Sequence, residues 1–461
     1  MSRSYEAKNI WEQKDHKDIM NYSQGYKDFL SNAKTERLAC KIAAKMAEKA
    51  GFKTYEEVMK SGRIKAGDKI ILSHRGKSAV LAVIGEDPIK SGMNIVGSHI
   101  DAPRLDLKPM PLYEEGNMAM FKTHYYGGVK KYQWTTLPLA MHGVVFTKEG
   151  KKVEISIGED DDDPVFYIND LLIHLAQDQM KKEASKVIEA EQLNVVVGQI
   201  PLSTDDKDIK CKIKENVLKF LEEKYGIEEI DFARAEIEIV PAGKARDVGF
   251  DRSFIAGHGH DDRVCAYAAL SAILNTKKPQ KTAVCLLTDK EEVGSQGNTG
   301  MQGRFFENMA AHLIALQEDY SDLKLRDALD NSKMLSGDVN GAYDPNFPEV
   351  WEKQNTAKVA EGITISKYTG SRGKSGSNDA NAEFLSEVTC IFDKAGVIWQ
   401  VGELGKTDQG GGGTIAYILA NLGVDVVDCG TSMLSMHAPI ELVSKADAYM
   451  TFKAYDAFLN R

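Results

Sequence analysis

Hydrophobic positions in the first part of the chain change from a helical period to short strand-like runs. Apolar residues recur every three to four positions over residues 36–50, which predicts a helix that ends near Gly51. Three shorter apolar runs predict β-strands at residues 69–73, 79–84 and 93–99. The third run ends in polar residues, so it carries polar chemistry at its C-terminal end.

Helical and strand-like segments alternate again in the C-terminal half. Helices are predicted at residues 263–274, 414–422 and 441–459, and strands at 282–287, 312–316 and 424–427. Strands that alternate with helices predict an α/β fold with a mostly parallel sheet and helices on both faces.

The region between these α/β parts has a different pattern. Over residues 112–238, short β-like runs such as 143–146 are separated by turns and charged stretches, and one helical segment lies near 171–181. The simplest interpretation is one α/β domain formed by residues 1–111 and 239–461, interrupted by an inserted β-rich domain.

Composition narrows the classes of partner. The 461 residues include 58 basic and 68 acidic side chains, a net charge of -10, and no basic cluster, which argues against nucleic acid. No apolar stretch approaches the ~20 residues of a membrane span, and the first residues do not resemble a secretory signal. The six cysteines lie far apart without a C-x-x-C pair, as expected for buried, reduced thiols. We therefore expect a cytoplasmic protein without a membrane partner.

Polar residues that follow predicted strands are candidates for a site, because ligands bind beyond the C-terminal ends of strands in α/β sheets. His99 ends one strand, and Asp101 lies two residues on, where it can accept the second ring N–H of a metal-bound histidine. Asp261 and Asp262 precede a helix, and two adjacent ionised carboxylates need a nearby cation. Each motif alone also fits a structural histidine or a helix N-cap.

The clearest motif is a pair of glutamates after the strand at residues 282–287. Glu291 and Glu292 precede a glycine turn, so one carboxylate can bind a metal while the other acts as a general base. Asp338 and His437 complete the set, although a histidine such as His437, taken alone, is more often a core residue. Carboxylates mixed with imidazole suit two divalent cations per subunit, for which we expect Zn²⁺, with Mn²⁺ or Co²⁺ as alternatives, whereas a closed structural zinc site favours cysteine.

In these motifs and their order, the chain resembles the M18 family of metallo-aminopeptidases, which includes aspartyl aminopeptidases and aminopeptidase I. The resemblance covers nearly the whole chain. It implies a two-metal enzyme that hydrolyses the N-terminal bond of peptides with a free N-terminus. The roles it implies are His99 and Asp338 on one metal, Glu292 and His437 on the other, Asp261 as the bridge, Glu291 as general base and Asp101 as the carboxylate behind His99.

The resemblance also implies an assembly. The family fold is a zinc-exopeptidase-like catalytic domain with an inserted dimerisation domain, and the subunits form a homo-oligomer, a tetrahedral dodecamer built from dimers. The inserted domain sends a histidine into the neighbouring subunit's active site, and His174 is the best match for it. The helical spacing and apolar neighbours of His174 fit a buried structural histidine equally well.

Substrate selectivity depends on two loops. Gly411 and Gly412 lie in a glycine run before a predicted helix, where bare amides can line a substrate pocket. This run resembles a bacterial branch of the family and differs from the enzymes specific for acidic residues. Lys374 or Arg372, in a short Gly- and Ser-rich loop, is a candidate to favour acidic or polar N-terminal residues, and a solvated, mobile loop is an equally good interpretation of the same residues. Many relatives have Asp-Asn where this chain has Asp261 and Asp262, so the second residue of the pair differs.

Two other functions fit the same residues. One is a related two-metal amidohydrolase or deblocking peptidase, which turns over acylated amines instead of peptides with a free N-terminus. The other is a scaffold protein that retained the fold without activity, against which the intact metal and base positions argue.

Overall fold

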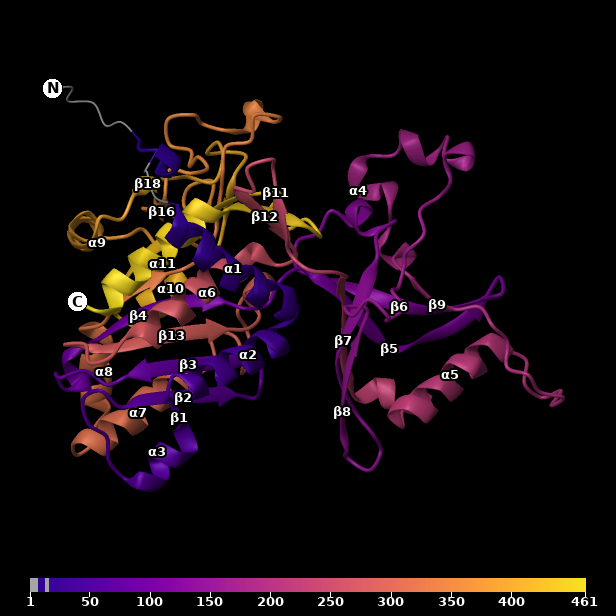
Figure 1. Cartoon of the computed structure of the whole chain (residues 1–461), viewed down its shortest axis with the longest axis horizontal. Coiled ribbons are helices and arrows are strands. Elements are labelled where there is room, and N and C mark those ends of the chain that lie inside the picture. The colour runs from indigo at the N-terminus through magenta and orange to yellow at the C-terminus, as the bar shows by residue number, and fades with distance from the viewer. Residues whose placement is uncertain (1–6, 13–15) are drawn as a thin grey trace. The chain divides into compact units, whose positions relative to one another are not determined.

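The computed structural model describes residues 7–12 and 16–461 (Figure 1). The chain divides into two compact units, of which the first comprises Met1–Ala102, Ala245–Met436 and Glu441–Arg461, and the second Pro103–Lys244 and His437–Ile440. The predicted boundaries at 111/112 and 238/239 fall inside two strands, Arg104–Glu115 (β5) and Ala235–Pro241 (β10). Because β5 and β10 pair with each other in one sheet, the second unit extends beyond the predicted 112–238 in both directions.

The first unit is built on a nine-stranded sheet. Its strands, in spatial order, are β1 (Lys53–Thr54), β2 (Lys69–His74), β3 (Ser78–Val83), β13 (Thr282–Thr288), β4 (Met93–His99), β14 (Lys333–Ser336), β20 (Asp425–Gly430), β16 (Ile363–Ser366) and β18 (Trp399–Val401). The four central strands, from β13 to β20, are parallel. The pairs β2–β3, β3–β13 and β20–β16 are antiparallel, so the sheet is mixed around a parallel centre.

Helices cover both faces of this sheet because successive strand side chains point in opposite directions. In β3, Leu81 and Val83 pack into one hydrophobic core, and Val80 and Ala82 pack into another. The first core includes residues of α1 (Lys17–Asn32), α2 (Glu36–Lys49), α6 (His260–Asn275), α9 (Ala382–Ala395) and α11 (Lys445–Leu459). The second includes residues of α3 (Tyr55–Ser61), α7 (Phe305–Gln317), α8 (Asp322–Asp330) and α10 (Ala416–Ala420).

A second, five-stranded sheet also belongs to the first unit. Its strands, in order, are β11 (Arg246–Val248), β12 (Phe254–Gly257), β22 (Glu441–Ser444), β21 (Ser432–Leu434) and β15 (Asn340–Gly341). The helix predicted at 441–459 is therefore wrong over its first four residues, because β22 pairs with β12 and β21 before the helix begins at Lys445.

The strand predicted at 312–316 is also wrong, because these residues lie within α7. Their apolar side chains continue a helical series that starts earlier, with Phe306, Met309 and Leu313 buried on one side. A five-residue apolar window cannot distinguish a strand from part of a buried helix.

The second unit contains a six-stranded sheet in the order β8 (Lys152–Ile157), β7 (Leu139–Phe146), β10, β5, β6 (Met118–Tyr126) and β9 (Val195–Gly198). Its hydrophobic core includes Ile213 and Leu221 of helix α5 (Lys212–Tyr225). A short helix, α4, spans Ala184–Val187. The continuous helix predicted near 171–181 is absent; this segment has two 3₁₀ turns, Ile173–Leu175 (η4) and Gln179–Lys181 (η5), and most of its side chains are exposed.

The structure also bears on the state of the cysteines and on membrane-spanning helices. All six cysteines are free thiols, and Cys40, Cys265, Cys285 and Cys429 are buried, whereas Cys211 and Cys390 are exposed. Within the described ranges, no helix is both long enough and apolar enough to cross a membrane.

Candidate metal centre

Parallel strands of the first unit bring the predicted residues to one edge of the sheet. In the β13–β4 pair, Thr288 lies opposite His99, so the chain that leads to Glu291 and Glu292 leaves the sheet beside that histidine. Strand β14 pairs with the other side of β4 and ends at Ser336, two residues before Asp338. The apolar strands thus position residues that are about 190 and 240 positions apart from His99 along the chain.

The side chains that meet at this edge form two overlapping groups. One group is His99, Glu291 and Asp338, and the other is His99, Asp261 and Glu292; within each, the potential ligand atoms lie within 4.8 Å of one another. His99 Nε2 is 3.2 Å from Asp261 Oδ1, 3.8 Å from Asp338 Oδ1 and 3.9 Å from Glu291 Oε2.

Asp261 reaches this cluster from an irregular start of α6. The helix begins at His260, but the backbone of Asp261 and Asp262 is not helical, and the peptide bond between them is cis. Gly259 before them has a φ of +76°, and a Cβ there would lie 1.7 Å from Arg263 Nη1. Glycine is therefore required at this turn, which directs Asp261 toward His99.

Asp101 connects His99 with the 3₁₀ turn Glu291–Val293, called the glutamate turn below. Its carboxylate is fully buried and accepts the backbone N–H groups of Glu291 (3.1 Å) and Glu292 (3.2 Å). His99 Nδ1 lies 3.3 Å from Asp101 Oδ1 and 3.1 Å from the Asp101 carbonyl oxygen. A proton on Nδ1 leaves the lone pair on Nε2, the nitrogen that faces the other carboxylates.

Burial and mutual repulsion define the electrostatics of the cluster. Burial raises the pKa of Asp338 well above its usual range, and the nearby Glu291, Asp262 and Asp261 raise it further, although His99 opposes them. Burial also raises the pKa of Asp262, whose carboxyl accepts the His99 backbone N–H at 3.3 Å. Burial lowers the pKa of His99, but hydrogen bonds to Asp101 and Asp261 outweigh it and hold that pKa well above its ordinary value.

This arrangement fits bound divalent cations. Several carboxyl groups and one imidazole converge in a buried place, where like charges repel unless a cation neutralises them. The donor atoms are the carboxylate oxygens and imidazole nitrogen that Zn²⁺, Mn²⁺ and Co²⁺ accept, and no cysteine belongs to either group.

His437 belongs to the second unit and to neither of these groups of described residues. It is partly buried, has a φ of +65°, and its Nδ1 lies 2.8 Å from the Gly128 carbonyl oxygen. A ring that donates Nδ1–H to a carbonyl presents its lone pair on Nε2, as metal-binding histidines do. The geometry around His437 does not match a core histidine.

His174 is exposed, within the 3₁₀ turn η4 of the second unit. Leu172 is 54% exposed, and Ile173 and Leu175 are each 69% exposed. The interpretation as a histidine buried in a helix is therefore wrong for the single chain. The apolar neighbours that suggested a core instead form an exposed hydrophobic segment.

The two loops predicted to affect selectivity lie side by side in the first unit. Gly370–Ser371 (β17) pairs with Gly411–Gly412 (β19), so Lys374 follows a strand that pairs with the glycine run. Lys374 Nζ lies 2.9 Å from Asp379 Oδ2 and 3.8 Å above the centre of the Tyr368 ring. Its charge is thus partly neutralised on the protein. Arg372, in the same loop, has a φ of +50°.

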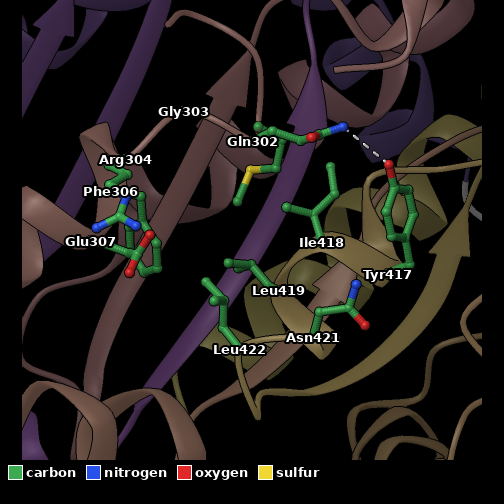
Figure 2. Close-up of a pocket in the computed structure, with 11 residues that line it drawn as sticks. Gln302, Gly303, Arg304, Phe306, Glu307, Tyr417, Ile418, Leu419, Asn421 and Leu422 are labelled. Atoms are coloured by element: carbon green, nitrogen blue, oxygen red, sulfur yellow. Dashed lines mark hydrogen bonds between the residues drawn. The ribbon is translucent and has the colours of Figure 1, made fainter. Parts of the chain in front are cut away.

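Two anchoring side chains were not predicted from the sequence. The glycine run ends at Thr414, whose hydroxyl donates to Asp428 at 2.7 Å, and burial raises the pKa of Asp428 to about 7. Gln302 donates to the carbonyl of Gly294, directly after the glutamate turn, and to the Tyr417 hydroxyl (Figure 2). It lines a pocket of about 270 Å³. Isolated Asp and Gln residues give no periodic signal, so only the three-dimensional structure reveals them.

Comparisons with known proteins identify the family of this chain. The family model for aminopeptidase I zinc metalloproteases (M18) matches residues 29–459. A probable M18 family aminopeptidase 1 of Clostridium acetobutylicum is 54% identical over 459 residues, which cover 99% of this chain and 98% of that protein. The crystal structure of aminopeptidase I from the same species has a TM-score of 0.93 at 52% identity, covering 99% of this chain and 100% of that one.

A more distant solved structure shares the fold. The mApe1 dodecamer of S. cerevisiae has a TM-score of 0.75 at 22% identity, and the match covers 95% of both chains.

Proposed function

Because this chain belongs to the M18 family of zinc metalloproteases and is a metallo-aminopeptidase, we propose that it uses two divalent cations, with Glu291 as general base, to release N-terminal residues from peptides. The observation that supports this most is the convergence of His99 with four carboxyl side chains at the edge of the sheet. A site of this kind suits metal-assisted hydrolysis.

The ligand assignment follows the family resemblance. His99 and Asp338 would hold one cation, Glu292 and His437 the other, and Asp261 both. Bound divalent cations would polarise the scissile carbonyl, make water more acidic and anchor the free amine of the substrate, which restricts cleavage to the N-terminal bond.

The chain's own residues supply the proton transfers. Glu291 takes a proton from the attacking water and passes it to the leaving amine. Asp101 supports this role because it accepts the N–H groups of both Glu291 and Glu292 and so orients the turn. The same carboxylate faces His99 Nδ1, which keeps Nε2 available as a ligand.

We propose that the second unit is a dimerisation domain and that the chain forms a homo-oligomer, a tetrahedral dodecamer built from dimers. The exposed apolar segment around His174 supports this, since large exposed hydrophobic patches commonly mark interfaces. A yeast structure with the same fold, mApe1, is a dodecamer. In the assembly, His174 would enter a neighbouring active site and stabilise the developing oxyanion. Composition favours the cytoplasm and no nucleic-acid or membrane partner.

The substrate pocket would include Lys374, Gly411 and Gly412. Their support is the β17–β19 pairing, which brings the Lys374 loop beside the glycine run. Lys374 would then favour acidic N-terminal residues.

The test is a panel of amino-acyl anilides, assayed after chelation and again after separate addition of Zn²⁺, Mn²⁺ and Co²⁺. We expect activity to disappear with the metals and to return with at least one of them. Turnover of acetyl-amino acids without turnover of amino-acyl anilides would instead identify an amidohydrolase or deblocking peptidase. A metal-replete protein with no hydrolytic activity would contradict the proposal and favour a scaffold.

A further inference from the structure

A buried glutamate outside the predicted site holds the backbone of the proposed bridging residue. Glu441 is 2% exposed, and its Oε2 accepts the backbone N–H of Asp261 at 3.1 Å. It is the first residue of β22, and β22 pairs with β12 so that Glu441 lies opposite Gly257. Four residues after Gly257, the chain reaches Asp261. The pairing of β22 with β12 thus places the Glu441 carboxylate within reach of the Asp261 backbone.

The N–H group that Glu441 accepts needs an acceptor from outside the helix. Asp261 lies in the first turn of α6, where backbone N–H groups have no partner within the helix. Its φ and ψ are -78° and 106°, which are not helical. A buried N–H without an acceptor is unfavourable, so removal of the carboxylate favours rotation of this peptide. Such a rotation moves Asp261 Oδ1 away from His99 Nε2, now at 3.2 Å.

A second buried carboxylate in the site also accepts backbone N–H groups. Asp101, also buried, accepts the N–H groups of Glu291 and Glu292. Two buried carboxylates from different strands and loops therefore hold the backbone of segments that carry the proposed ligands. A carboxylate makes a stronger acceptor than an amide, and its negative charge also favours nearby cations.

We propose that Glu441 is a positioning residue of the metal centre, which holds Asp261 through its backbone N–H and thereby sets the affinity of the site for divalent cations. The inference rests on the proposed function, in which Asp261 is the bridging ligand. Glu441 touches neither substrate nor the reacting atoms in this assignment. Its contribution is to hold the bridging aspartate in the orientation that metal binding requires.

Three substitutions separate the hydrogen bond from the charge. Glu441→Met has nearly the same length and removes the acceptor, Glu441→Gln keeps an acceptor oxygen without the charge, and Glu441→Asp keeps the charge with a shorter reach. Asp447→Asn is the matched control, because Asp447 is equally buried in the same unit and accepts the N–H groups of Ala360 (2.6 Å) and Gly362 (2.8 Å). Neither of its partners belongs to the proposed site.

The measurements are Zn²⁺ and Co²⁺ affinity of the chelated full-length protein by calorimetric titration, the visible spectrum of the Co²⁺ form, and thermal unfolding of the metal-free form. Replacement of residues that orient ligands typically lowers metal affinity about 10–100-fold. We expect a loss of that size for Glu441→Met, an altered Co²⁺ spectrum, and a smaller loss for Glu441→Gln. Asp447→Asn should lower the unfolding temperature without changing the affinity or the spectrum. If Glu441→Met does not fold, Glu441→Asp provides the test, with weaker binding expected.

Wild-type affinity and spectrum in the Glu441 variants would overturn the inference, as would an equal loss in Asp447→Asn. Asp261→Ala distinguishes this failure from failure of the proposed function. If Asp261→Ala loses metal while Glu441→Met binds normally, only the role of Glu441 is wrong. If Asp261→Ala keeps its full metal content, the bridging role of Asp261 itself is contradicted, and the inference falls with it.

Discussion

Replacement of Asp101 by asparagine is a direct test of how the site is held together. The Asp101 carboxylate has no exposed surface and receives the N–H of Glu291 on Oδ1 and the N–H of Glu292 on Oδ2. Asparagine has one oxygen, so its amide NH₂ must face one of these two donors. His99 keeps a partner for Nδ1, since the Asp101 carbonyl oxygen lies 3.1 Å away. The cost therefore falls on the glutamate turn.

The size of this cost follows from the hydrogen bonds. A hydrogen bond to a charged group contributes about 1.5–3 kcal/mol, and a buried donor without a partner costs about 1–3 kcal/mol. These two energies partly describe the same hydrogen bonds, so they do not add in full. We expect Asp101→Asn to lose roughly 2–4 kcal/mol in total. Because 1.4 kcal/mol corresponds to about a factor of ten, even half of this loss at the metal centre lowers metal affinity roughly 10-fold. The rest appears as lower stability of the metal-free protein.

The assay compares metal affinity, kcat and urea unfolding of the metal-free protein for Asp101→Asn and Asp447→Asn. Both substitutions disturb a buried carboxylate that accepts two backbone N–H groups. We expect both to lower stability and only Asp101→Asn to lower metal affinity and kcat. The reasoning is refuted if Asp101→Asn loses stability alone.

Three further predictions address selectivity, assembly and pH dependence. Lys374→Ala should lower kcat/KM for acidic substrates up to about fivefold and for leucyl substrates less, because an exposed charge contributes about 1 kcal/mol at most; equal losses on both would remove its role. Co-expressed His174→Ala and Glu291→Ala subunits should recover part of the activity if His174 acts in the neighbouring site, and mixed oligomers without recovery would exclude this. The pKa of Asp428 is raised from 3.8 to about 7 by burial, so the folded state binds its proton more tightly and the unfolding free energy should fall as pH rises from about 4 to 7 and level off above. In urea unfolding of the metal-free protein, Asp428→Asn should lack this pH-dependent fall in unfolding free energy. Identical pH profiles for the variant and the wild type would contradict the raised pKa of Asp428.

The fold was most predictable where apolar runs are long and buried on both sides. The strand predicted at 93–99 has the same bounds as β4. The helix predicted at 36–50 starts with α2 and is one residue too long, because α2 ends at Lys49. Errors occurred where tertiary pairing decides the outcome: Glu441–Ser444 is a strand because β12 and β21 lie beside it, although its spacing continues the following helix. Local pattern carries no information on such partners.

The candidate site was predictable to the extent that its residues follow strands. His99, Glu291 and Glu292 lie at the ends of neighbouring parallel strands, and the structure brings them together with Asp261. Glu441 was not predictable, because its contact with Asp261 joins positions 180 residues apart and neither residue type marks it. The apolar neighbours of His174 are exposed, so they indicate a surface that an isolated sequence cannot distinguish from a core.

The central claim is that Glu291 acts as a general base beside two bound cations without being required to hold them. Glu291→Gln tests it most directly, with metal content measured by elemental analysis and turnover measured on an amino-acyl anilide. We expect two metal equivalents per subunit, as in the wild type, and a kcat about 10²–10⁴-fold lower, since general-base catalysis contributes that much. A near wild-type kcat, or a single metal equivalent in the wild-type protein, would contradict the account.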